Sequence, residues 1–124
     1  MGAVRVGDVT VTPVETRHLG RTEPGLRHVS FVIHGSLCIW FTGDAAPIGW
    51  KNMTHLPRPD VLIAPYAYAN TQSAWEFSRN IAKKVVILHL PEQGNDPYGL
   101  WDSVKSTTKE ENVHLPEIGE WIVL

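Results

Sequence analysis

The chain has 124 residues, a length that predicts a single domain over residues 1–124. With 43% hydrophobic and 9% aromatic residues, it has the composition of a globular domain that buries a core. A net charge of −2 provides neither a basic surface for nucleic acid nor a polybasic membrane anchor.

The features that bear on the cellular compartment predict a cytoplasmic protein with no membrane association. Residues 1–5 lack the charged and apolar regions of a signal peptide. No apolar run approaches the roughly 18 residues that a membrane-spanning helix needs. The single cysteine, Cys38, cannot form an internal disulfide and lies among apolar residues, as a small core residue does.

The first half of the chain contains one stretch of alternating β-branched residues and two apolar runs rich in strand-forming residues, which predict strands. We expect these strands over residues 9–14, 28–33 and 37–42. His34-Gly35-Ser36 has the length and composition of a tight hairpin between the last two. Residues 16–27 predict a polar loop, and the proline-bearing residues 45–59 predict an irregular stretch with one short helical turn.

The second half alternates strand and helix signals. Residues 60–65 and 85–88 are short apolar runs, typical of buried strands in a parallel arrangement. Residues 70–84 predict a helix that begins with a capping box from Ser73 to Glu76. Asp96 and Pro97 predict the cap and first residue of a second helix. The apolar pieces after Val113 predict a terminal strand or hairpin arm.

This order of elements predicts an α/β (α+β) fold with one mixed sheet and helices on one face. Two helices are too few to cover both faces of such a sheet. We therefore expect a second layer on the other face, supplied by another domain or by a second copy of the chain in a homodimer.

Three residues of the kinds that bind metals stand where strands end or loops begin: His18, Asp44 and His89. Imidazole and carboxylate together suit zinc, iron or manganese. Asp44 and His89 each follow a buried strand, which places them at one edge of the sheet, and Gly43 permits a tight turn before Asp44. We predict that the three residues hold one metal with open positions for water. The structural alternatives are a turn or cap for Asp44, a hydrogen-bonded strand end for His89 and an exposed loop residue for His18.

The remaining candidates carry weaker signals. Four histidines are interpreted as structural or exposed: His28, His34, His55 and His114. Four aromatic residues are interpreted as core, with pocket lining near the metal edge as the alternative: Trp50, Tyr66, Tyr68 and Trp101. The sequence contains no phosphate-binding glycine loop, nucleophile elbow or paired-cysteine zinc motif.

Taken in order, five segments resemble the metallo-β-lactamase superfamily, and most closely its lactonase-like and predicted metal-dependent hydrolase branch. They are Thr16-Arg17-His18, residues 29–33, residues 39–44 ending in Thr42-Gly43-Asp44, residues 60–63, and residues 85–89 ending in His89. The resemblance covers nearly the whole chain, from about residue 9. It implies that His18 binds one metal, that Asp44 bridges two metals and that His89 binds the second.

The sequence also departs from this family. The His-x-His-x-Asp-His motif, which supplies four ligands and the residues that activate the attacking water, is not in the chain. What remains resembles the C-terminal half of an αββα sandwich whose two halves are related by pseudo-twofold symmetry. Each half of that sandwich contributes one sheet and its outer helices.

Three interpretations of function follow. The first is a metal-dependent hydrolase half-domain that is weakly active or inactive alone, with zinc, manganese or iron as its metal. It would act as a homodimer or with a partner chain that supplies the missing half, and the isolated chain could lack the metal. The second is a non-catalytic dimerising domain with a degenerate metal site. The third is that the natural gene product is longer. The sequence leaves open whether the chain is an enzyme, and it does not identify a substrate.

Overall fold

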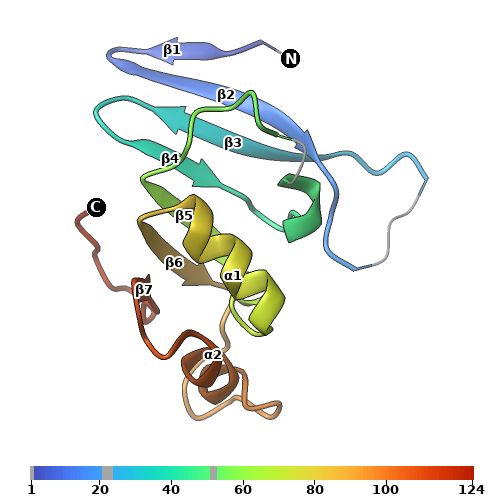
Figure 1. The fold of residues 1–124 in the computed structure, drawn as a ribbon, viewed down its shortest axis with the longest axis vertical. Coiled ribbons are helices and arrows are strands. Elements are labelled where there is room, and N and C mark those ends of the chain that lie inside the picture. The colour runs from blue at the N-terminus through green and yellow to red at the C-terminus, as the bar shows by residue number, and fades with distance from the viewer. Residues whose placement is uncertain (1, 21–23, 51–52) are drawn as a thin grey trace.

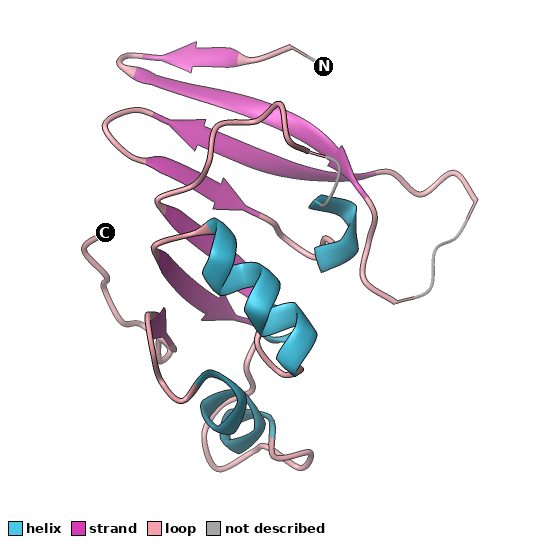
Figure 2. Ribbon diagram, in the orientation of Figure 1, coloured by secondary structure: helices cyan, strands magenta, loops and turns pink. Residues whose placement is uncertain are grey.

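The computed structural model describes residues 2–20, 24–50 and 53–124. Within these residues, seven strands form one sheet in which the order in space is the order in the chain (Figure 1). The strands are β1 (Val4–Val6), β2 (Val9–Thr16), β3 (His28–His34), β4 (Cys38–Phe41), β5 (Val61–Pro65), β6 (Lys84–Leu88) and β7 (Val113–His114). The helices are α1 (Gln72–Ile81) and α2 (Leu100–Thr108), with 3-10 turns η1 (Pro47–Trp50) and η2 (Tyr66–Tyr68) (Figure 2).

The sheet is mixed, as predicted. Strands β1 to β4 pair antiparallel, and β4 to β7 pair parallel. The predicted hairpin joins β3 to β4, where Gly35 N–H donates to the carbonyl of Leu37 at 2.9 Å. The predicted short helical turn in residues 45–59 is η1, although residues 51 and 52 of that stretch lie outside the described residues. Strand β1 was not predicted.

The helix boundaries differ from those predicted. Helix α1 is capped by Thr71, whose side chain accepts from the backbone N–H of Ala74 at 3.4 Å, so the capping box at Ser73 was wrong by two residues. The carboxylate of Asp96 does accept from the first N–H groups of α2, those of Leu100 at 2.9 Å and Trp101 at 3.0 Å. Because Pro97 precedes the helix by three residues, its predicted place as the first helical residue was also wrong.

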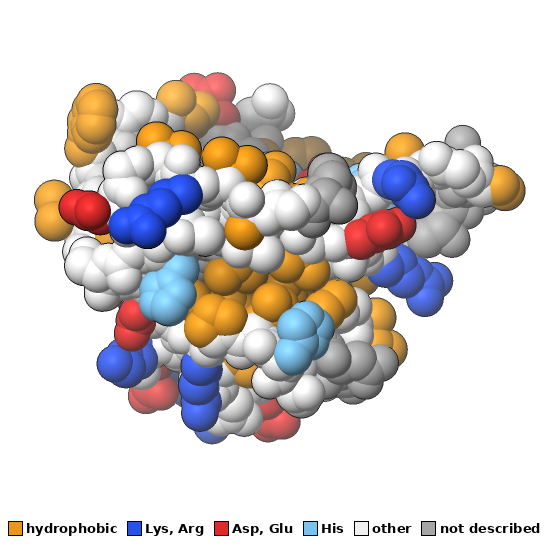
Figure 3. Space-filling view, turned by 90° about the horizontal axis from the view of Figure 1, so that it is seen from above, with side chains coloured by type: hydrophobic (Ala, Val, Ile, Leu, Met, Phe, Trp, Pro, Cys, Tyr) orange, Lys and Arg blue, Asp and Glu red, His pale blue; other side chains and the backbone are white. Residues whose placement is uncertain are grey.

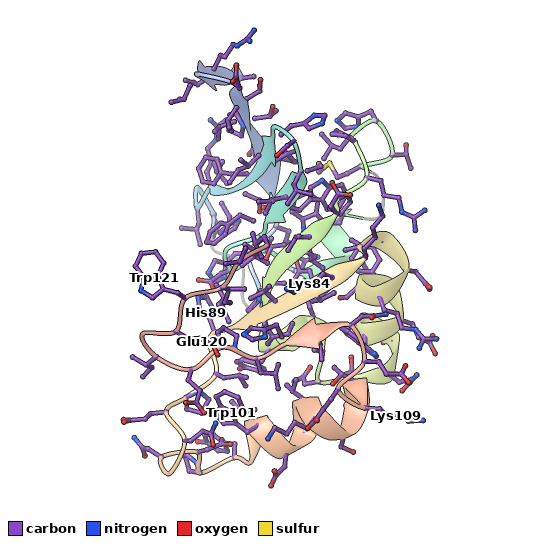
Figure 4. The ribbon with its side chains drawn as sticks, turned by 90° about the vertical axis from the view of Figure 1, so that its left-hand side faces the viewer. Lys84, His89, Trp101, Lys109, Glu120 and Trp121 are labelled. Atoms are coloured by element: carbon purple, nitrogen blue, oxygen red, sulfur yellow. The ribbon has the colours of Figure 1, made fainter. Side chains whose placement is uncertain are left out.

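The C-terminal prediction holds only in part. Residues Val113–His114 form the short strand β7 beside β6. Residues 121–124 form neither a strand nor a hairpin arm, and Trp121 is 96% exposed. Figure 4 shows Trp121 and α1 on opposite sides of the sheet.

The hydrophobic core lies between the sheet and the helices. Side chains alternate between the two faces of each strand, so Val32 and Trp40, which are paired across β3 and β4, point into this core. The Trp40 ring stacks on that of Trp50 from η1, with centroids 4.6 Å apart and planes 20° apart. Trp75 of α1 and Val104 of α2 belong to the same cluster, which confirms the predicted fold class with helices on one face.

The opposite face of the antiparallel strands is less well covered. Phe31 and Phe41 are direct cross-strand partners on that face, and they are 38% and 37% exposed. Seen from the β1 end of the molecule, hydrophobic side chains also reach the surface between charged and histidine side chains (Figure 3). Among the described residues, no helix combines the length and apolar character needed to cross a membrane.

Candidate metal centre

Asp44 occupies the turn that follows β4, at the carboxyl end of the parallel strands. Thr42 continues the ladder through its N–H, which donates to the carbonyl of Ile63 at 3.0 Å. Gly43 then turns the chain with φ at 57°, a conformation that costs other residues energy. The turn places Asp44 at the edge of the sheet where open α/β folds bind ligands.

The two predicted histidines reach Asp44 from different elements. His18 comes from the loop after β2, and its Nε2 lies 3.6 Å from Oδ2 of Asp44. His89 follows β6 directly, and its Nδ1 lies 3.0 Å from Oδ1 of Asp44. The side chains of His18, Asp44 and His89 are 36%, 45% and 52% exposed, so a solute can reach all three. The structure thus brings the three sequence-predicted residues together.

Their arrangement consists of two separate pair contacts, one to each carboxylate oxygen of Asp44. Among the described residues, no three His, Cys, Asp or Glu side chains are already grouped as a metal site. A common metal would therefore require side-chain adjustment around Asp44.

The His18 ring has a defined hydrogen-bonding role. Its Nδ1 lies 2.6 Å from the carbonyl oxygen of Leu19. Because a carbonyl can only accept, Nδ1 carries the proton, and in the neutral ring the lone pair is on Nε2. Nε2 is the nitrogen that faces Asp44. A ligating histidine in a protein metal site shows the same pattern, with its other nitrogen bonded to a carbonyl or carboxylate.

The backbone of the Asp44 turn is held on several sides. Leu19 N–H donates to the carbonyl of Asp44 at 2.7 Å, and Ala46 N–H donates to the carbonyl of Arg17 at 2.6 Å. The Tyr68 hydroxyl donates to the carbonyl of Ala45 at 2.6 Å. These bonds join the loop after β2 and the 3-10 turn η2 to the residues beside Asp44.

Tyr68 is fully buried and belongs to the core rather than to a pocket lining. Its hydroxyl also accepts from Nε1 of Trp50 at 2.9 Å. Burial raises the pKa of the Tyr68 phenol, so its hydroxyl stays protonated and able to donate to Ala45. Two of the four aromatic residues do line cavities. Trp101 lines one with Leu90 and Pro91, which follow His89 in the chain, and Trp50 lines another with Trp40. Figure 4 labels Trp101 and His89.

His28, which was interpreted from the sequence as structural or exposed, contacts the turn directly. Its Nε2 accepts from the backbone N–H of Asp44 at 3.1 Å, and its Nδ1 lies 2.8 Å from Oγ1 of Thr16. Its ring meets that of His18 edge to face, with centroids 5.5 Å apart. Burial lowers the pKa of His28, His18 lowers it further and Asp44 raises it. His28 lies on the helix-covered face of β3, two residues before the buried Ser30 and four before the core residue Val32. Strand alternation with Val32 could have indicated this face from the sequence, but not the contact of His28 with Asp44.

The remaining histidines lie away from Asp44. His34 ends β3 and is exposed, and His55 is exposed in the stretch after η1. His114, also interpreted from the sequence as structural or exposed, has its Nε2 2.6 Å from a carboxylate oxygen of Glu120.

No protein-family model matches the sequence, and neither does any curated protein sequence. Solved structures do match the fold. A possible metal-dependent hydrolase from Veillonella parvula superposes with a TM-score of 0.71 at 15% identity, over 100% of this chain and 57% of that protein. The metallo hydrolase Igni18 from the hyperthermophilic archaeon Ignicoccus hospitalis gives 0.62 at 17% identity, over 97% of this chain and 56% of that protein.

The metallo-beta-lactamase fold protein YhfI from Bacillus subtilis gives a TM-score of 0.61 at 16% identity, over 93% of this chain and 49% of that protein. This chain therefore spans about half the length of each of the three proteins. At these identities the likeness concerns the fold. The fold of this chain is metallo-β-lactamase-like.

Proposed function

We propose that this chain is a metal-dependent hydrolase half-domain in which His18, Asp44 and His89 hold a divalent metal. The observation that carries the proposal is the place of Asp44, whose two carboxylate oxygens each face a histidine from a different element. Zinc, manganese and iron suit this set of nitrogen and oxygen donors.

The chemistry of the donors supports a metal. The backbone around Asp44 is fixed by hydrogen bonds, while both carboxylate oxygens face only the two imidazoles among the described contacts. His18 directs an unprotonated nitrogen to the same place when its ring is neutral. A bound divalent metal would supply a Lewis acid that polarises a substrate oxygen.

The second part of the proposal is that another protein layer completes the molecule. Burying Phe31 and Phe41 against a second sheet would remove apolar surface from water, which is the main driving force for association. A homodimer packed sheet to sheet, or a partner chain with the missing half, would provide that layer. If a second copy provides the layer, light scattering at micromolar concentration should give a dimer, and Phe41→Asp should give a folded monomer. A wild-type monomer would exclude the homodimer.

The alternative function is a non-catalytic dimerising domain. It is favoured by the lack, among the described residues, of three side chains already grouped as a metal site. Elemental analysis after purification without chelators separates the two functions. The half-domain hydrolase should retain near-stoichiometric zinc, manganese or iron, whereas the dimerising domain should retain none.

Hydrolysis tests the half-domain itself. With added zinc or manganese, we expect weak or no turnover of ester, lactone and phosphodiester substrates by the chain alone. We expect it because no general base is identified beside Asp44 and the family's principal metal-binding motif is not in the sequence. Strong turnover that Asp44→Ala abolishes would show instead that this chain is a complete hydrolase.

A further inference from the structure

A chain of side-chain hydrogen bonds begins and ends in the same three-residue turn. The backbone N–H of Asp44 donates to Nε2 of His28 at 3.1 Å, and Nδ1 of His28 lies 2.8 Å from Oγ1 of Thr16. Oγ1 of Thr16 lies 2.8 Å from Oγ of Ser30, which donates to the carbonyl of Thr42 at 2.7 Å. This series of hydrogen bonds thus links Thr42 and Asp44, the residues on either side of Gly43.

The direction of every bond in this chain can be deduced. Ser30 gives its only hydroxyl proton to a carbonyl, so Thr16 must be the donor to Ser30. Thr16 has then used its own proton, so Nδ1 of His28 must be the donor to Thr16.

The hydrogen bond at the Asp44 end of this series requires the same tautomer of His28. A backbone N–H can only donate, so Nε2 of His28 carries a lone pair where it meets Asp44. A neutral imidazole with its proton on Nδ1 meets both requirements, and no other state of the ring does. Ser30 and Thr42 are fully buried and Thr16 is 9% exposed, so water is poorly placed to replace these bonds.

We propose that Thr16 holds His28 in the Nδ1–H tautomer and that His28, so held, is the positioning residue of Asp44. The opposite tautomer would direct a ring N–H at the N–H of Asp44, so the two donors would repel and the turn would shift. The consequence for metal binding rests on the proposed function, whereas the tautomer and the geometry of the turn do not.

Two matched variants of Thr16 test whether its hydroxyl sets the tautomer of His28. Thr16→Val removes the hydroxyl at nearly constant volume, and Thr16→Ser keeps it. In nitrogen NMR spectra, wild type and Thr16→Ser should show His28 with a protonated Nδ1, whereas Thr16→Val should show a mixture of tautomers. Hydrogen exchange of the Asp44 amide should be about five- to tenfold faster in Thr16→Val, as expected for one lost hydrogen bond.

A second pair tests His28 itself and decides the question if Thr16→Val fails to fold. The side-chain oxygen of His28→Gln can reach the Asp44 N–H, whereas the shorter His28→Asn side chain can reach only toward Thr16. We expect the Asp44 amide in His28→Gln to exchange within about twofold of wild type, and in His28→Asn about five- to tenfold faster. Equal exchange in the two variants would overturn the proposal, as would an unchanged tautomer in Thr16→Val.

Zinc titration by calorimetry adds the functional consequence. If wild type binds zinc, Thr16→Val should bind it about tenfold more weakly, and Thr16→Ser should bind it like wild type, in keeping with the effect of residues that orient metal ligands. Equal affinity in Thr16→Val and wild type would overturn the positioning role. If wild type binds no zinc, the proposed function fails, and the tautomer and amide exchange still decide whether Thr16 and His28 position Asp44.

Discussion

Replacing Gly43 with alanine should destabilise the protein in two ways that can be separated. The residue has φ at 57°, which costs a side chain about 1–2 kcal/mol. An added Cβ would also lie 3.2 Å from Nε2 of His28 and 3.4 Å from its Cε1, so the imidazole must move away. Weakening its bond with the Asp44 N–H costs about 0.5–1.5 kcal/mol more. The total is about 1.5–3.5 kcal/mol.

Gly7 provides the matched control. It has φ at 59°, and a Cβ added there would meet no atom within 4 Å, so Gly7→Ala carries the backbone cost alone. Urea unfolding at neutral pH measures both free energies, and Gly43→Ala should lower the midpoint by about 1 M. In a His28→Ala background, the cost of Gly43→Ala should fall to that of Gly7→Ala. If Gly43→Ala costs no more than Gly7→Ala in the wild-type background, the described packing of His28 against Gly43 is wrong.

Three further variants address the supports of the site and the fold. Tyr68→Phe should cost about 2–4 kcal/mol because it leaves a buried indole N–H and a buried carbonyl unpaired. Thermal denaturation measures this cost. Tyr98→Phe, at an 86% exposed position, is the control and should leave the melting temperature unchanged. Equal melting temperatures for Tyr68→Phe and Tyr98→Phe would refute the role of the Tyr68 hydroxyl. The lowered pKa of His28 means that the unfolded chain binds more protons, so stability should fall as the pH drops through and below the ordinary value of 6.5. His28→Gln should flatten the pH dependence of the unfolding free energy between pH 7 and 5, measured by urea titration. An unchanged dependence would show that His28 is not the group responsible for it. Thr71→Ala should cost about 0.5–1 kcal/mol of unfolding free energy through loss of the α1 cap, and a neutral effect in the same titration would show that the 3.4 Å bond contributes nothing.

The sequence predicted the structure best where the burial of a strand determines both its residue types and its place in the sheet. Residues 60–65 and 85–88 are continuous apolar runs because parallel strands are buried on both faces, and they form β5 and β6. The strand ends then place Asp44 and His89 at one edge, so their approach could be predicted from the pattern. His18 was grouped with them by residue type and loop position, and the resemblance supported that grouping, because a polar loop carries no periodic signal that would place it at the same edge.

The supports of the Asp44 turn could not be read from the sequence. His28 lies 16 residues before Asp44, and its contact depends on the register of β2 with β3, which pairs Thr16 with His28. A register is set by turn geometry and by which face is buried, and neither is fixed by single residues. The predicted cap of α1 was wrong for a simpler reason. Thr71 and Ser73 are both residue types that cap helices well, and the end of the preceding turn selects between them.

The measurement that tests the central claim most directly is calorimetric zinc titration of wild type, Asp44→Asn and Asp102→Asn. Asp102 is an exposed residue of α2, so its variant removes the same charge away from the site. We predict one zinc bound per chain in wild type and in Asp102→Asn, and binding at least about tenfold weaker in Asp44→Asn. Failure of wild type to bind zinc, manganese or iron, or equal zinc affinity in Asp44→Asn and wild type, would contradict the assignment of Asp44 as the central metal ligand.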